Sequence, residues 1–268
     1  MDTITHALSG ALLAMATAPG RSPSAAKHMD VRERPPDRSP SAAKHMDQLE
    51  QPPGTAQPGT LNLRTRIVAG AAAAAFPDID FVLRAVDTLT DLNLHQGVTH
   101  SLLLLPVWAL LLARLFAAIS RQRYRWQTFY GIAALGLAIH IGGDLVTAYG
   151  TQILAPISDA RFSWPLVFVF DPVVTVILLA GLVAAARWQA QRMAQFAFLF
   201  LAGYFGLQAV LQQQAVAIGE AHAHTLQLDA ATSNALPQPL SPFHWLIVVQ
   251  HGDTYYETRV DLAGIPRD

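Results

Sequence analysis

Long apolar runs separated by short polar segments make up most of this chain. The run from Thr128 to Tyr149 is 22 residues long and carries one formal charge, Asp144. This length is enough to cross the hydrocarbon core of a bilayer as a helix. The same pattern predicts five further apolar helices, the first two of them short: Ile4–Ala18, Ile67–Leu83 with a break at Pro77, Ser101–Ser120, Leu166–Ala186 and Ala194–Leu211. We therefore expect an all-α integral membrane bundle of about six hydrophobic helices.

The polar segment from residue 19 to 66 has a different character. It is rich in Pro, Ser and Lys/Arg, and the decamer RSPSAAKHMD occurs in it twice, at Arg21–Asp30 and Arg38–Asp47. A perfect tandem copy without apolar periodicity is typical of a duplication in a linker and not of a folded repeat. We expect a flexible linker, with His28 and His45 solvated.

The C-terminal tail is polar and contains two β-rich runs. The sequence FHWLIVVQ-HGD-TYYETRVDL places a Gly-containing turn between them, which predicts a β-hairpin. The pattern thus divides the chain into an N-terminal helix (1–18), the linker (19–66), a membrane helical domain with the site (67–211) and a soluble tail with the hairpin (212–268).

Composition supports the membrane assignment. The chain has 268 residues, of which 52% are hydrophobic and 14% are charged, whereas soluble domains average about 25% charged residues. A net charge of −1 gives no indication of nucleic-acid binding. Cysteine is absent from the sequence, so a metal site would have to use His and carboxylate ligands.

Lys and Arg predict the orientation, because they favour the cytoplasmic side of a membrane. Three segments, Pro19–Arg66, Arg121–Gln127 and Arg187–Met193, hold 13 of the 18 Lys and Arg residues. Placing them in the cytoplasm of a bacterial-type inner membrane puts the tail from Gln212 onward on the outer, periplasmic side.

His140 and Asp144 are the clearest chemical signal within an apolar run. Residues at i and i+4 lie on one helical face, so the imidazole and the carboxylate point the same way. An acidic residue in mid-span costs roughly 2.5 to 3.5 kcal/mol on insertion scales. A shared divalent cation would offset this cost, and the alternative is a helix-terminal pair in contact with water or with each other.

Other His and Asp residues collect on the same predicted side of the membrane. His6 opens the first helix, Asp78 and Asp80 follow the break in the second, and His95 and His100 precede the third. The simpler interpretation of the two aspartates is a helix end facing lipid headgroups. Because the orientation was assigned from Lys and Arg alone, the collection of these groups at one face favours a shared metal site.

Six motifs in this order resemble the YdjM-like family. They are M-D-x-x-T-H at Met1–His6, F-P-D-I-D at Phe76–Asp80, H-x-G-x-T-H-S at His95–Ser101, H-x-x-x-D at His140–Asp144, Y-G-T-Q at Tyr149–Gln152 and F-D-P at Phe170–Pro172. Members are described as inner-membrane-associated metal-dependent hydrolases, which is the activity that the resemblance implies. Gln96 departs from the pattern, which usually has Arg there.

The order of these residues is more distantly similar to the zinc-dependent phospholipase C fold. That resemblance implies that Asp78 or Asp80, His100, His140 and Asp144 hold one metal ion. It also implies that His6 and Asp144 help to hold a second.

The sequence therefore predicts a membrane-bound hydrolase that acts on a phosphoester or lipid-linked ester at the outer face. Expected metal ligands are His6, Asp78, His100, His140 and Asp144. Asp80 and His95 are expected catalytic residues, as ligands, orienting groups or a general base, and Thr99 and Ser101 are candidates for orienting the ligands. Zinc fits the His and carboxylate set, with manganese or magnesium as alternatives. Two other functions stay open, namely an ion pathway through His140 and Asp144, and a non-catalytic membrane scaffold with a structural metal.

Overall fold

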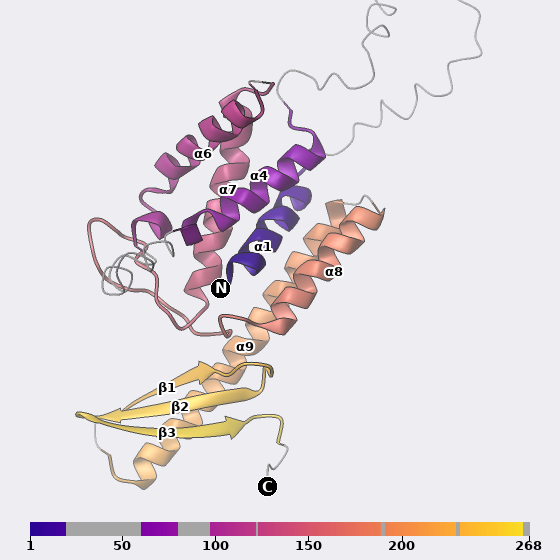
Figure 1. Cartoon of the computed structure of the whole chain (residues 1–268). Helices are drawn as coiled ribbons and strands as arrows, with labels where there is room; N and C mark the ends of the chain where they lie inside the picture. Colours follow the sequence, from indigo (N-terminus) through magenta and orange to yellow (C-terminus); the bar gives the residue numbers. More distant parts are fainter. Residues whose placement is uncertain (20–59, 80–96, 122, 189–190, 229–230, 265–268) are drawn as a thin grey trace, which may run out of the picture.

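The structure, a computed structural model, describes residues 1–19, 60–79, 97–121, 123–188, 191–228 and 231–264. Over these residues it is mostly helical, with a three-stranded antiparallel sheet at the C-terminal end (Figure 1). The six α-helices are α1 (Thr3–Ala16), α4 (Leu63–Ala75), α6 (Leu105–Ile119), α7 (Trp126–Leu145), α8 (Pro172–Trp188) and α9 (Gln191–Thr225).

Helices α1, α4 and α7 approach one another closely because small residues line their contacts. A Cβ added to Gly10 of α1 would lie 2.3 Å from the Gly70 carbonyl oxygen of α4. A Cβ added to Gly136 of α7 would lie 2.8 Å from the Ala73 Cβ. Small residues of this kind let backbones pack closely where lipid leaves no hydrophobic driving force between helices. The three-helix contact forms the frame of the site described below.

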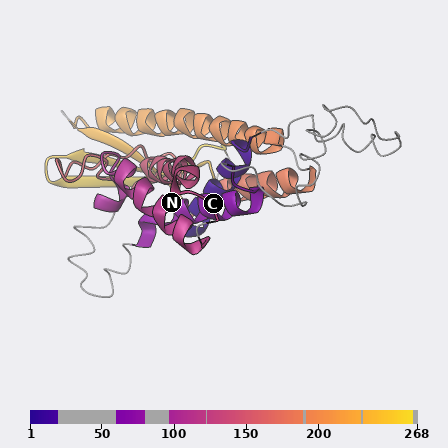
Figure 2. The same ribbon diagram turned by 90° about the horizontal axis from the view of Figure 1, so that it is seen from above.

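The remaining helices flank this frame on opposite sides. Helix α6 packs on α7, while α8 and α9 pack on each other and on α1. Figure 2 shows α9 running along one side of the molecule, with the sheet at one end and α6 on the other side. Leu12, Leu178 and Leu201 are buried together where α1, α8 and α9 meet.

The sheet has the order β1-β2-β3, with both pairs antiparallel. Its strands are β1 (Thr232–Pro237), β2 (His244–His251) and β3 (Thr254–Asp261). Alternate residues of β2, namely Trp245, Ile247 and Val249, are buried on the face that packs against the end of α9. The β2–β3 hairpin confirms the hairpin that the sequence predicts in the C-terminal tail. Strand β1, which pairs with β2, was not predicted from the sequence.

Among the residues that the structure describes, two helices, α7 and α9, are long and apolar enough to cross a membrane. Helices α1, α6 and α8 are apolar but shorter, so these lengths do not confirm six spans. Helix α9 also continues to Thr225, past the expected end of the last span at Leu211. Helix α8 begins at Pro172, and the Asp171 carboxylate caps it by accepting hydrogen bonds from Val173 N and Val174 N.

Candidate metal centre

The last two turns of α7 carry His140 and Asp144, both with fully buried side chains. His140 Nε2 lies 3.1 Å from Asp144 Oδ2. The spacing of four residues places the two groups on one face of the helix, as the sequence predicts. A polar pair buried this completely requires partners from neighbouring elements.

The carbonyl of Ala74, in the last turn of α4, sets the orientation of His140. Its oxygen lies 2.6 Å from His140 Nδ1. A carbonyl oxygen only accepts hydrogen bonds, so Nδ1 carries the hydrogen and donates. In the neutral ring, Nε2 therefore presents a lone pair toward Asp144.

Helix α1 contributes His6, whose ring stacks on that of His140 with centroids 3.7 Å apart. His6 Nε2 lies 3.1 Å from Asp144 Oδ1, and the amino group of Met1 also contacts this oxygen. Gly143 leaves room for His6, because a Cβ there would lie 3.0 Å from His6 Cε1. The helix thus combines two ligand-type side chains with a small residue between them.

The turn after α4 brings in Asp78, whose Oδ1 lies 3.6 Å from His140 Nε2. Its side chain is the least buried of the group, at 13% exposed. One ligand atom from each of His6, Asp78, His140 and Asp144 can be chosen so that all four lie within 4.8 Å of one another. The group therefore has the residue types and the proximity that a metal site requires.

His100 lies beside this four-residue group. It belongs to η2 (Val98–His100), and its Nε2 is 2.9 Å from His140 Nε2 and 3.2 Å from Asp144 Oδ2. Its other ring nitrogen, Nδ1, lies 2.9 Å from Thr99 Oγ1. Ser101 does not reach the group, because its hydroxyl donates to the Ala155 carbonyl oxygen.

The balance of donors and acceptors favours a cation in this group. Within the described residues, His6 Nδ1 and Asp78 Oδ2 are buried atoms without a hydrogen-bond partner, and the polar atoms nearest to Asp144 Oδ2 are ring nitrogens of His100 and His140. Asp144 Oδ2 lies near His140 Nε2, but this nitrogen has no hydrogen to donate when Nδ1 carries it. Two imidazoles and two carboxylates are a donor set that suits zinc and also manganese.

The structure brings together four of the five predicted ligands and places the fifth, His100, in contact with two of them. Asp80 and His95, the predicted catalytic residues, lie outside the described residues. The role of each residue in binding or catalysis stays a prediction. Three contributors to the site were not predicted from the sequence: the Ala74 carbonyl, the Met1 amino group and Gly143. Only Gly143 had a signal, as the second glycine of the H-I-G-G-D run.

Comparisons with known proteins agree with the motif analysis. The sequence model of a family described as "YdjM inner membrane protein" matches residues 1–215. YfhP of Bacillus subtilis (strain 168), described as an uncharacterized protein, is 26% identical over 200 residues. That match covers 72% of this chain and 58% of YfhP, so the chain spans less than two thirds of this relative. Comparison with solved structures gives no match.

Proposed function

This chain belongs to the family of YdjM inner membrane proteins, and from that premise we propose that it is a membrane-bound, metal-dependent hydrolase. The observation that carries the proposal is the convergence of His6, Asp78, His140 and Asp144 within 4.8 Å. Ionisable groups inside membrane domains are rare and mark functional sites.

The same four residues would hold the metal ion, with His100 as a fifth ligand or as a neighbour that binds substrate. Zinc is the proposed metal, with manganese or magnesium as alternatives. When bound, such an ion lowers the pKa of a water molecule and polarises a scissile phosphoryl or carbonyl group. Among the described residues, Asp78 Oδ2 is a buried acceptor without a hydrogen-bond partner, and His6 Nδ1 is a second one when His6 Nε2 donates to Asp144 Oδ1; a cation would satisfy both, which supports this assignment.

The surrounding residues hold the ligands in place. The hydrogen bond from His140 Nδ1 to the Ala74 carbonyl fixes the tautomer of His140. Loss of such a contact typically lowers metal affinity or activity about 10- to 100-fold. Thr99 Oγ1 makes the corresponding contact with Nδ1 of His100. In the proposed reaction, Asp80 or His95 moves the proton as general base.

The topology and the substrate are also part of the proposal. We place six spans in the inner membrane, with the site and the tail on the periplasmic side. His140 and Asp144 lie in the last turns of α7, whereas Arg125 precedes its first residue. The site and the arginine-containing loop before α7 are therefore at opposite ends of this helix, which supports their placement at opposite faces of the membrane. A site at the membrane surface suits a lipid-linked phosphoester or ester, and the proposed partners are the bilayer and this substrate, with no nucleic acid.

The test measures metal content and hydrolysis in the purified full chain. We expect one or two zinc ions per chain, and activity in a phosphatase and esterase screen that is lost on chelation. Asp144→Asn should abolish both properties. Asp261→Asn, a change of the same kind at the partly exposed His244–Asp261 pair of the sheet, should leave both unchanged. Equal metal content in the wild type and Asp144→Asn would overturn the proposal.

A structural metal in a non-catalytic scaffold is the second candidate. Its support is the burial of His6, His140 and Asp144, whose side chains are at most 1% exposed, because structural sites are closed whereas catalytic sites keep an open position. Metal binding lost in Asp144→Asn, together with an inactive wild-type protein, would favour this candidate over the hydrolase.

A further inference from the structure

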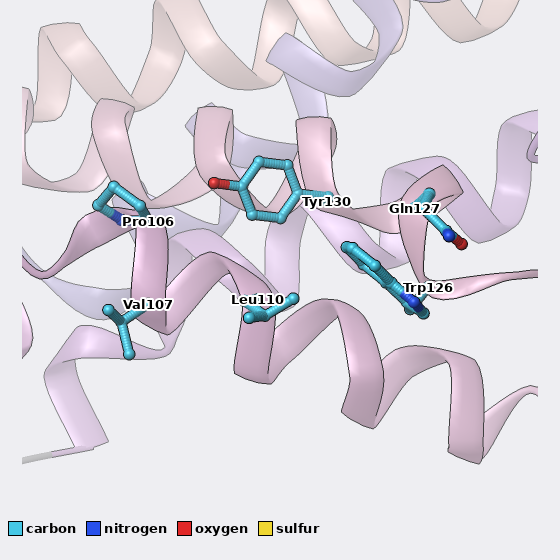
Figure 3. A pocket seen from close by; sticks show the side chains of 6 residues that line it. All are labelled: Pro106, Val107, Leu110, Trp126, Gln127 and Tyr130. Carbon is cyan, nitrogen blue, oxygen red and sulfur yellow. The ribbon is translucent and has the colours of Figure 1, made fainter.

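An apolar groove is lined by residues of α6 and α7, none of which belongs to the metal centre. Its volume is about 580 Å³, and it is lined by Pro106, Val107, Leu110, Trp126, Gln127 and Tyr130. Figure 3 shows Pro106 and Val107 at one end, Leu110 in the middle facing Tyr130, and Trp126 at the other end. The groove therefore follows α6 lengthwise, which suits an extended chain.

The Trp126 end of the groove carries positive charge. The Arg114 guanidinium carbon lies 5.7 Å from the centroid of the Trp126 ring, a distance typical of a cation–π contact. Arg121, Arg123 and Arg125, all exposed, follow α6 in the loop that leads to Trp126. The groove thus joins an apolar channel to the Arg114 guanidinium, and three more arginines follow in the loop after α6.

The sequence around Arg114 contains no acidic residue that could balance this charge. The sequence from Ser101 to Gly143 contains four arginines and no Asp or Glu. In the part of the chain that the structure describes, no ion pair involves Arg114. Arg114 lies five residues before the end of α6 at Ile119, which is about 7.5 Å along the axis. An exposed arginine at that depth in a membrane protein requires an anion or a path to the headgroup layer.

We propose that the groove binds an anionic phospholipid of the surrounding bilayer. One acyl chain lies along Leu110 toward Pro106, and the phosphate contacts Arg114 beside Trp126. Arginine donates in a fork that matches phosphate oxygens, and tryptophan favours the headgroup level. The inference rests on the membrane location of the family and not on the proposed hydrolase activity.

Lipid retention tests the assignment. The full chain is purified from nanodiscs of phosphatidylcholine and phosphatidylglycerol at about 4:1, and the lipids that remain bound are counted by native mass spectrometry. We expect the ratio of bound phosphatidylglycerol to bound phosphatidylcholine to be about fivefold higher than the ratio in the disc, the effect of one arginine near an anionic lipid. Arg114→Gln should abolish the enrichment.

Arg187→Gln is the control, because Arg187 also lies toward the C-terminal end of an apolar helix and near an exposed tryptophan, Trp188, but does not border this groove. It should keep the enrichment. Leu110→Trp fills the groove without changing charge and should lower retention, so the test does not depend on one variant folding.

Three outcomes would overturn the assignment: no enrichment in the wild type, enrichment that survives in both Arg114→Gln and Leu110→Trp, or equal loss in Arg187→Gln. Asp144→Asn should keep the enrichment. A failure of the hydrolase proposal is therefore distinguishable from a failure of this one.

Discussion

Two His–Asp pairs in this molecule have almost the same geometry and different surroundings. His140 Nε2 lies 3.1 Å from Asp144 Oδ2 in α7, and His244 Nε2 lies 3.2 Å from Asp261 Oδ2 between β2 and β3. The first pair is fully buried, whereas the side chains of the second are 23% and 16% exposed. Distance alone does not distinguish a metal-site candidate from a surface pair.

The difference lies in what else reaches each pair. His6, His100 and Asp78 approach the α7 pair from three other elements, so several acceptor atoms share one buried volume. The sheet pair joins neighbouring strands at the register position His244↔Asp261, where water can satisfy both groups. A site of the first kind depends on helix packing that brings distant segments together, and a pair of the second kind depends only on local strand pairing.

The largest expected effect comes from disturbing that helix packing. In Gly10→Ala the new Cβ would lie 2.3 Å from Gly70 O and 2.5 Å from Ala74 Cβ, both in α4. Helices α1 and α4 would have to separate, which moves His6 away from Asp144. We expect a loss of about 1 to 3 kcal/mol in the free energy of unfolding, measured by thermal or denaturant unfolding in detergent, together with loss of bound metal.

Gly131→Ala is the control for this change. Gly131 is exposed on α7, and a Cβ there meets nothing within 4 Å. The same added methyl group should be neutral or stabilise by roughly 0.5 to 1 kcal/mol, because alanine favours a helix over glycine. Equal stability of the two variants would contradict the tight crossing of α1 and α4.

A smaller effect is expected next to the buried pair itself. Gly143→Ala puts a Cβ 3.0 Å from His6 Cε1 and 3.3 Å from His6 Nδ1, so the ring must shift by a few tenths of an ångström. We expect metal affinity to fall about tenfold, the scale of a disturbed ligand orientation, with little change in unfolding. Metal titration by calorimetry measures this.

Its neighbour Gly142 provides the comparison, because a Cβ there meets nothing within 4 Å. Gly142→Ala makes the same chemical change one residue away and should bind metal as the wild type does. If the two variants bind metal equally, His6 does not belong to the site in the way its geometry implies.

Sequence reasoning anticipated the parts of the molecule that follow from local rules. The i, i+4 spacing of His140 and Asp144 and the β2–β3 hairpin each depend on a few neighbouring residues. The contact of Gly10 with Gly70 could not be predicted, because it joins helices separated by the linker and glycine is common in the chain. The Ala74 carbonyl had no sequence signal, since every residue carries one.

The end of the last helix and the number of strands in the sheet differ from the sequence prediction for physical reasons. The polar residues that follow Leu211 predict the end of the last span there. Glutamine and alanine nevertheless favour a helix, and α9 continues to Thr225, where the sheet packs on it. Strand β1 has the sequence TSNALP and lies at the edge of the sheet. Apolar and polar residues alternate little in it, so the sequence contains no local pattern that predicts a strand here.

The smallest expected effect belongs to the sheet pair. A double-mutant cycle with His244→Ala and Asp261→Ala should give a coupling free energy of about 0.2 to 1 kcal/mol, the range for exposed ion pairs. Salt should lower it, because charges in contact with water are screened. Metal content should not change in any of the three variants, since neither residue belongs to the buried group. A coupling well above this range, or a loss of metal, would mean that the tail contributes to the site, and the distinction between the two pairs would fail.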